Sequence, residues 1–283
     1  MKDKDFVSII IPTYNRSLHY IKRAIKSIQQ QTFKNHEIII SDDNLPNSNY
    51  SLQINNYCLK NNLKYLNTTG KKGANVARNR GADIAVGNYL AFLDDDDIWA
   101  KNKLELQLNY FTDDNIGMVY SNGYVVTSNS KYLYTKHKNF VKEGNLYKLF
   151  LYNYIGPTVT ALIRKECFYN VGMFDETLPA KQDYDLWIRL VSKYRVVGIN
   201  EPLYIYTRHI SHQITDDYTS IVNGYKKIYK KYYSFIKNDF IIKFFFYFRI
   251  SKVYKAQKQY LNSKKYVLKA FACINTDDLK VIF

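Results

Sequence analysis

The stretch Tyr89–Trp99 reads YLAFLDDDDIW and places an apolar run directly before four consecutive carboxylates. An apolar and aromatic run that follows Gly87-Asn88 is typical of a buried β-strand. In open α/β sheets, ligands bind at the carboxyl end of such strands. Because four adjacent carboxylates repel one another, the pattern favours a divalent cation with oxygen ligands. A solvated acidic turn that caps the next helix is the alternative interpretation.

Two earlier apolar runs, 6–11 and 37–40, also end in polar residues. Helical spacing of apolar residues between the two runs predicts a βαβ unit and therefore a parallel sheet. The ends of these strands would share one sheet edge with Asp94–Asp97. An aromatic ring such as Tyr14 can stack on a base, and Asp42 or Asp43 can accept the N3–H of uracil. We therefore expect a site for a nucleotide and a metal at this edge.

The loop Thr69–Gly73 is basic and feeds a predicted helix over residues 74–82. A glycine-bounded loop at a helix N-terminus suits a phosphate group, although the signal alone is weak. Further along, the pattern predicts short strands at 118–120 and 124–126, a strand at 158–163 and a helix at 165–169. A helix from Gln182 carries Asp183 and Asp185 in its first turn, where the helix dipole alone would favour acids.

The chain has 283 residues with 46% apolar composition, enough for one large domain with a small appendage. No apolar run approaches the roughly 20 residues of a membrane-spanning helix. The first residues, MKDKD, lack the apolar core of a signal peptide, so we expect a cytoplasmic protein. Three widely spaced cysteines form no CxxC pair, which argues against a disulfide framework or a zinc–thiolate site.

Basic charge concentrates at the end of the chain. Residues 220–283 contain 14 Lys/Arg and three Asp, so they carry +11 of the net +16. Aromatic residues at 244–248 are interleaved with lysine and arginine, and 255–272 reads as one more amphipathic helix. This segment can be a helical cap on the main domain, a homo-oligomer surface or a peripheral helix at the inner face of an anionic cell membrane.

Six stretches together resemble the family 2 glycosyltransferases with the GT-A fold, and they occur in the family's order across roughly residues 6–215. They are Val7–Arg16, Asp42-Asp43, Ala77–Gly81, Phe92–Trp99, Val171–Glu176 and Asp183–Leu190. The resemblance implies a Rossmann-like, mainly parallel sheet flanked by helices. It further implies a transferase domain at 1–219, with a nucleotide-sugar half at about 1–117 and an acceptor half at about 118–219. Residues 220–283 would be a basic helical appendage.

The resemblance also implies an inverting, metal-dependent transfer from a nucleotide diphosphate sugar, with UDP the expected nucleotide. Asp183 would be the general base and Asp96 would bind Mn²⁺ or Mg²⁺, with His209 or His212 as a further metal or phosphate ligand. The remaining expected positions contact the nucleotide: Pro12, Thr13, Tyr14, Asp42, Asp43, Arg78, Asn79, Asp94 and Asp95. The acceptor would be a glycan or lipid-linked hydroxyl in cell-surface polysaccharide synthesis, and no nucleic acid partner is expected.

Two departures qualify this resemblance. Asn44 follows the acidic pair where the family usually has glycine, and Gln182 stands where many members have glutamate. The Gln-x-x-Arg-Trp element of processive synthases is absent, which favours addition of a single sugar.

A nucleotidyltransferase remains the rival enzyme, although the glycine-rich basic signature it would need after the first strand is missing. A basic RNA- or lipid-binding module is the non-enzymatic alternative.

Overall fold

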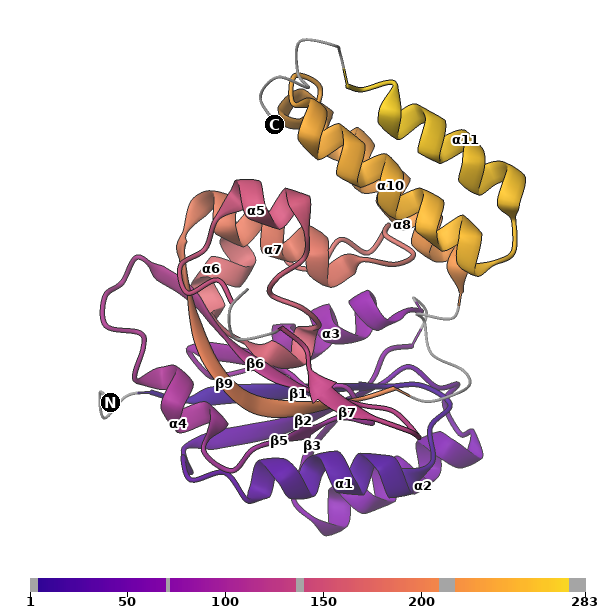
Figure 1. Cartoon of the computed structure of the whole chain (residues 1–283). Helices are drawn as coiled ribbons and strands as arrows, with labels where there is room; N and C mark the ends of the chain where they lie inside the picture. Colours follow the sequence, from indigo (N-terminus) through magenta and orange to yellow (C-terminus); the bar gives the residue numbers. More distant parts are fainter. Residues whose placement is uncertain (1–4, 70–71, 136–139, 209–216, 275–283) are drawn as a thin grey trace.

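The computed structural model describes residues 5–69, 72–135, 140–208 and 217–274. Within these ranges, nine strands form one curled sheet in the order β3-β2-β1-β4-β8-β6-β9-β5, with β7 paired to β6 (Figure 1). The strands are β1 Val7–Thr13, β2 His36–Asp42, β3 Lys64–Asn67, β4 Tyr89–Phe92, β5 Ile98–Trp99, β6 Ile116–Val126, β7 Lys131–Leu133, β8 Ala161–Arg164 and β9 Arg195–Thr207. One sheet thus runs through both predicted halves of the 1–219 region.

Strands β1 to β4 are parallel, as the βαβ pattern predicted. The register pairs Thr13 with Asp42 and Asp42 with Asn67, so the carboxyl ends of β1, β2 and β3 lie side by side. On the other side of β1, Ile10 pairs with Phe92, two residues before the acidic run. The polar strand ends therefore meet at one edge of the sheet.

Helices cover both faces of the sheet. They are α1 Leu18–Gln29, α2 Asn49–Lys60, α3 Ala74–Asp83, α4 Lys103–Leu108, α5 Leu146–Leu151, α6 Lys165–Asn170, α7 Gln182–Lys193, α8 Tyr218–Lys231, α9 Tyr233–Ile236, α10 Phe240–Ala256 and α11 Tyr260–Phe271. Successive side chains of a strand point to opposite faces. Ile9 and Ile11 accordingly pack in the core shared with α1, α2 and α4, whereas Ile10 packs in the core shared with α3 and α5 to α8.

Two predicted elements were wrong. The expected pair of short strands at 118–120 and 124–126 is one strand of 11 residues, β6. The polar residues between them resemble a turn, but the Asn122 side chain bonds to the Gly123 N–H and the Thr135 carbonyl, and the pairing with β9 shifts register there. The expected strand at 158–163 begins as a 3-10 turn, Thr158–Thr160, and β8 starts only at Ala161.

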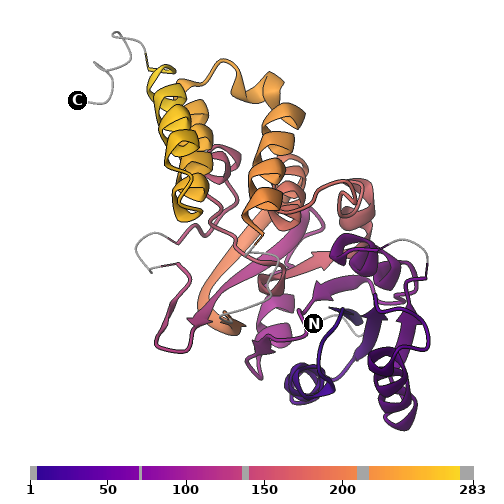
Figure 2. The same cartoon turned by 90° about the vertical axis from the view of Figure 1, so that its right-hand side faces the viewer.

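The segment from residue 217 onward forms the helices α8 to α11. The expected helix over 255–272 is interrupted because Lys258 has a positive φ of 59°, and α11 then runs back along α10 (Figure 2). Ile242, Phe246 and Ile250 recur every four residues on α10 and are buried. Ile242 and Phe246 belong to the same core as α5 and α7. The inner face of the tail therefore packs on the main domain as a helical cap.

Among the helices that the structure describes, none combines the length and the apolar composition needed to cross a bilayer.

The packing of α10 predicts how two neighbouring phenylalanines differ. Phe246→Ala should lower the free energy of unfolding of the whole chain by about 3–5 kcal/mol, because the ring is fully buried among core aromatics such as Phe150. Phe245→Ala, whose ring is 37% exposed, is the matched control and should change little. Denaturant unfolding measures both. A Phe246→Ala chain with wild-type stability would contradict the packing of the tail into the core.

Candidate active site

A cavity of about 610 Å³ opens at the sheet edge where the polar strand ends meet. It is lined by residues from the ends of β1, β2 and β4, from the start of α3 and from the start of α7. Residues singled out in the sequence that line it are Pro12, Thr13, Tyr14, Asp43, Arg78, Asp94, Asp95, Asp96 and Asp183. Segments as far apart in the chain as Pro12 and Ile221 thus contribute to one space.

Two arginines form ion pairs with the three cavity-facing carboxylates of the acidic run. Arg78 on α3 contacts Asp94 at 2.7 Å. Arg16, just after β1, donates from Nε to Asp95 and from Nη2 to Asp96, each at 3.0 Å. The two arginines come from different segments, so their ion pairs connect the end of β4 to α3 and to the loop after β1.

The carboxylates of the run have unequal surroundings. Burial raises the pKa of Asp95 to about 7, although the positive charge of Arg16 and a hydrogen bond from Thr13 at 2.7 Å favour the ionised form. Asp97 is fully buried and accepts the Thr207 N–H at 2.8 Å. Burial, followed by the charges of its neighbours, holds the pKa of Asp97 well above its usual range. Asp97 is thus a structural group that fastens β9 to the acidic run.

The structure separates the two acids at the end of β2. Asp42 is fully buried and bonds to the Tyr65 hydroxyl at 2.7 Å and to the Asn44 side chain at 2.6 Å. Asp43 lines the cavity, where it accepts the Gly73 N–H at 2.7 Å. Asn44, the departure from the family pattern, also accepts the N–H of Asn15. The second acid of the pair is therefore the one that a ligand in the cavity can reach.

Tyr14 and Asn79 also differ in position. Tyr14 lines the cavity with 59% of its surface exposed, so its ring is available for stacking. Asn79 is buried on α3 and exchanges hydrogen bonds with the Phe174 backbone, at 2.9 Å to its carbonyl and 3.0 Å from its N–H. Asn79 does not line the cavity. Its observed contacts hold the 174 region against α3.

Asp183 lies in the first turn of α7 and lines the same cavity as the strand ends. One of its oxygens accepts the Tyr184 N–H at 2.7 Å, as expected of an acid in a first helical turn. Burial raises the pKa of Asp183, and the nearby Lys181 charge opposes that rise. Asp185, in contrast, is fully buried and paired with Arg189, so it cannot serve as the alternative base.

The carboxylates of the cavity suit a cation whose coordination shell is completed by oxygen atoms of a bound substrate. No group of three or more His, Cys, Asp or Glu side chains suited to a metal occurs in the described ranges. His209 and His212 lie outside those ranges. Mg²⁺ and similar hard cations are commonly held by one or two carboxylates together with phosphate oxygens of the substrate. The cavity-facing oxygens of Asp94 to Asp96 suit that arrangement.

Several residues of the cavity escaped the sequence analysis. Arg16 is the last residue of the stretch Val7–Arg16. Its position just after a predicted strand end was the signal that could have identified it as a cavity residue. Lys181 lines the cavity with a positive φ of 65°, and Tyr206 reaches it from β9. Ile221 comes from α8, beyond the stretch that resembled a family. No local pattern marks Ile221, because only the packing of α8 brings it to the cavity.

The sequence and the fold have clear relatives. The model of the family described as Glycosyl transferase family 2 matches residues 8–178. An uncharacterized glycosyltransferase of Rickettsia felis is 32% identical over 200 residues, which are 70% of this chain and 32% of that protein. The chain thus spans about a third of the length of that relative. In Escherichia coli, UDP-Glc:alpha-D-GlcNAc-diphosphoundecaprenol beta-1,3-glucosyltransferase WfgD is 31% identical over 198 residues, 70% of this chain and 74% of that one.

A solved structure extends the likeness over nearly the whole chain. The crystal structure of S. aureus TarS 1-349 in complex with UDP-GlcNAc matches with a TM-score of 0.64 at 17% identity. The match covers 93% of this chain and 90% of that chain. At this level of identity the likeness concerns the fold, and it includes the mainly parallel sheet flanked by helices and the helices at the C-terminal end.

Proposed function

This chain belongs to glycosyl transferase family 2, and from that premise we propose that it transfers one sugar from a UDP-linked donor to a hydroxyl group of a lipid-linked glycan acceptor, with inversion at the anomeric carbon. The observation that carries the proposal is the single cavity that Tyr14, Asp43, the acidic run and Asp183 share. Groups suited to a base, a diphosphate and a reacting hydroxyl thus line one space. Family membership also argues against the two alternatives, a nucleotidyltransferase and an RNA-binding module.

The donor's nucleotide would occupy the strand-end side of the cavity. The exposed ring of Tyr14 would stack on uracil, and Asp43 would accept its N3–H. Asp43 already accepts the Gly73 N–H and the Thr68 hydroxyl, and its remaining lone pairs are free to receive a further donor. Arg78 would help fix the nucleotide while it keeps its ion pair with Asp94.

The acidic run would meet the ribose and the diphosphate. Asp95 would face the ribose, and Asp96 together with diphosphate oxygens would hold Mn²⁺ or Mg²⁺. Such a cation, when bound, supplies Lewis-acid stabilisation of charge on a leaving diphosphate. Arg16 contacts both acids and would have to share them or turn toward the phosphate oxygens when the donor binds. The guanidinium fork suits either partner.

Asp183 would act as the general base. Its carboxylate would accept the proton of the acceptor hydroxyl as that oxygen bonds to the anomeric carbon and the bond to the diphosphate breaks. Attack from the side opposite the leaving group inverts the configuration. A positioned base contributes about 10²–10⁴-fold to such a step. Because burial raises the pKa of Asp183, its proton affinity is closer to that needed near neutral pH.

A lipid-linked acceptor is favoured by the relative and by the tail. The printed name of WfgD gives that protein a diphosphoundecaprenol acceptor. In this chain, α11 forms the outer layer of the tail (Figure 1). Leu261 and Leu268, seven residues apart on one face, are 87% and 61% exposed, and exposed lysines flank them. We propose that this face rests on an anionic membrane surface where the acceptor is found.

Asp96→Ala should abolish metal-dependent UDP binding without unfolding the chain. Asp96 is buried and pairs with Arg16, but Arg16 keeps Asp95 as a partner when Asp96 is removed, so the chain should stay folded with at most a modest fall in the thermal midpoint. Calorimetric titration with UDP in Mn²⁺ and in EDTA measures the effect. Asp114→Ala, which removes an acid whose side chain is 88% exposed, is the control. Unchanged metal dependence in Asp96→Ala would show that the metal assignment is wrong.

Asp183→Asn should reduce turnover about 10²–10⁴-fold while UDP affinity stays near that of the wild type. The base acts when ionised, so the rate should fall as pH drops below its pKa. Because that pKa is raised, the fall should begin at a higher pH than for an ordinary aspartate. Initial rates against pH for wild type and variant test this. Near-normal turnover, or an acidic limb that persists in the variant, would assign the base elsewhere.

The double substitution Leu261→Asn and Leu268→Asn should weaken binding to vesicles that contain phosphatidylglycerol by more than about tenfold. Burying a leucine contributes about 1.5–3 kcal/mol, and two leave the interface. Leu59→Asn on α2, also 72% exposed, is the control. Co-sedimentation should weaken with salt, because nearby lysines contribute about 1 kcal/mol each at an anionic surface. Equal binding by all three proteins would exclude the α11 surface.

A further inference from the structure

The segment 175–181 leads from α6 into α7 and ends two residues before Asp183; we call it the base loop. Two helices from distant parts of the chain hold it. On the α3 side, Asn75 donates to the carbonyls of Asp175 at 2.8 Å and Leu178 at 3.2 Å. On the α8 side, Lys227 donates to the Thr177 carbonyl at 2.6 Å. The loop is therefore fixed through its backbone on both sides.

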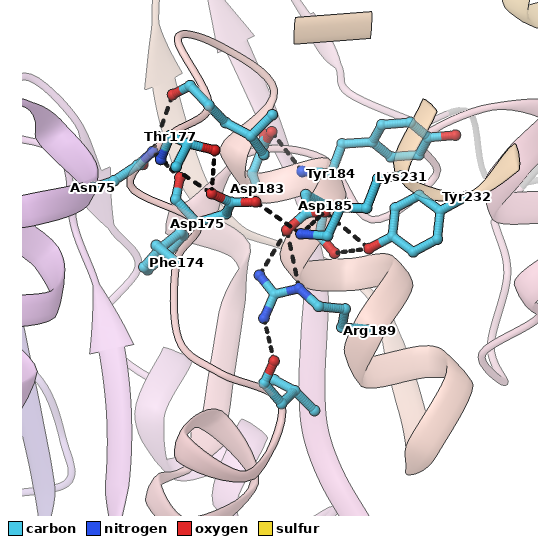
Figure 3. A network of polar contacts seen from close by, with 12 residues as sticks. Asn75, Phe174, Asp175, Thr177, Asp183, Tyr184, Asp185, Arg189, Lys231 and Tyr232 are labelled. Carbon is cyan, nitrogen blue, oxygen red and sulfur yellow. Dashed lines mark hydrogen bonds and ion pairs between the residues drawn. The ribbon is translucent and has the colours of Figure 1, made fainter. Parts of the chain in front are cut away.

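Lys231, the last residue of α8, joins the base loop to α7. Its ammonium lies 2.8 Å from an Asp175 oxygen and 2.8 Å from an Asp185 oxygen (Figure 3). These two acids stand on either side of Asp183 in the sequence. The buried Asp185 carboxylate also contacts Arg189 at 2.7 Å and the Tyr232 hydroxyl at 2.8 Å. One lysine thus connects the beginning of the base loop with the first turn of the helix that carries Asp183.

Backbone packing brings α8 directly against the loop. A Cβ atom at Gly224 would lie 2.5 Å from the Ala180 carbonyl oxygen, so only glycine permits this approach. One turn earlier, Ile221 lines the cavity beside Ala180 and Lys181. Lys181 has a positive φ of 65°, a conformation that a non-glycine residue keeps only when its surroundings impose it. The position of α8 therefore constrains the backbone just before Asp183.

The ion pair with Lys231 is present across the working pH range. Burial raises the pKa of Asp175, but hydrogen bonds from Lys231 and Thr177 outweigh it and lower the pKa to about 2. Asp175 is therefore ionised well below neutrality, and its contact with Lys231 is lost only as pH falls from its ordinary pKa toward about 2. The contact does not respond to pH near neutrality, which fits a fixed support.

We propose that α8 positions the general base: Lys231, through Asp175 and Asp185, and Gly224, through Ala180, set the base loop so that Asp183 faces the acceptor hydroxyl. The inference rests on the proposed transfer reaction. Lys231, Asp175 and Asp185 do not line the cavity, so they act as positioning residues. A displacement of about 1 Å at a reacting group can reduce a rate about 10²-fold. The residues of α8 lie beyond the 8–178 match to the family model.

Lys231→Met tests the proposal in the full chain. With UDP-glucose, Mn²⁺ and a short-chain GlcNAc-diphospholipid as probes, kcat should fall about ten- to a hundredfold, while the dissociation constant for UDP stays within about twofold. Lys231→Arg keeps the charge and should retain at least about half of the wild-type kcat. Lys230→Met, an exposed lysine one residue earlier on the same helix, is the matched control and should behave as wild type.

Gly224→Ala gives a second route that does not depend on the ion pair. Alanine is a better helix former than glycine, so α8 itself should fold, but the added Cβ must displace Ala180. The variant should lower kcat with UDP affinity preserved. If Lys231→Met and Gly224→Ala both reduce only the thermal midpoint, with wild-type kcat below that midpoint, α8 is a stabilising element and the proposal is overturned.

Amide hydrogen exchange separates this inference from the proposed function. In Lys231→Met, the amides of residues 178–185 should exchange faster than in Lys230→Met, whether or not the probes are turned over. Faster exchange with an inactive wild type would reject the chosen reaction and keep the positioning of the loop. Unchanged exchange in that segment would reject the positioning role, even if the wild type transfers sugar.

Discussion

The structure depends on keeping four consecutive carboxylates at the end of one strand. Like charges this close repel one another, and groups from three other parts of the chain offset that repulsion. Asp94 takes Arg78, Asp95 and Asp96 share Arg16, and Asp97 is buried against the backbone of β9. These neighbours come from α3, from the loop after β1 and from the last strand. These contacts therefore also hold the walls of the cavity together, because each neighbour belongs to a segment that contributes to its lining.

Much of the fold and site could be predicted because the deciding patterns are local. Residues close together in the sequence specify the strand before the acidic run, the βαβ unit and the helix that begins at Gln182. The choice between Asp42 and Asp43 could not be made in this way. It depends on Tyr65, which lies on the neighbouring strand and donates its hydroxyl hydrogen bond to Asp42. The burial of Asn79 likewise depends on the backbone near Phe174, almost 100 residues away.

The tail shows the same limit more strongly. Its composition suggested cap, oligomer surface and membrane helix as alternatives, yet the structure gives its two sides different surroundings. The inner side, with Phe246, packs into the core of the main domain, and the outer side exposes Leu261 and Leu268 among lysines. A helical period identifies the apolar positions, but only the neighbouring helices decide which of them are covered. Lys231 gave no local signal, because both of its partners lie on other elements.

The place of Lys231 has a consequence for protein engineering. The match to the family model ends at residue 178, and this boundary would be a natural junction for a chimera that exchanges donor specificity between two family members. Such a junction falls between Asp175 and Asp185, so the two acids that share one lysine would come from different parents. A fusion that ignores α8 could keep a compatible sheet, but Lys231 and its two acidic partners would no longer come from one parent. The unit to exchange in this chain is therefore the sheet together with α7 and α8.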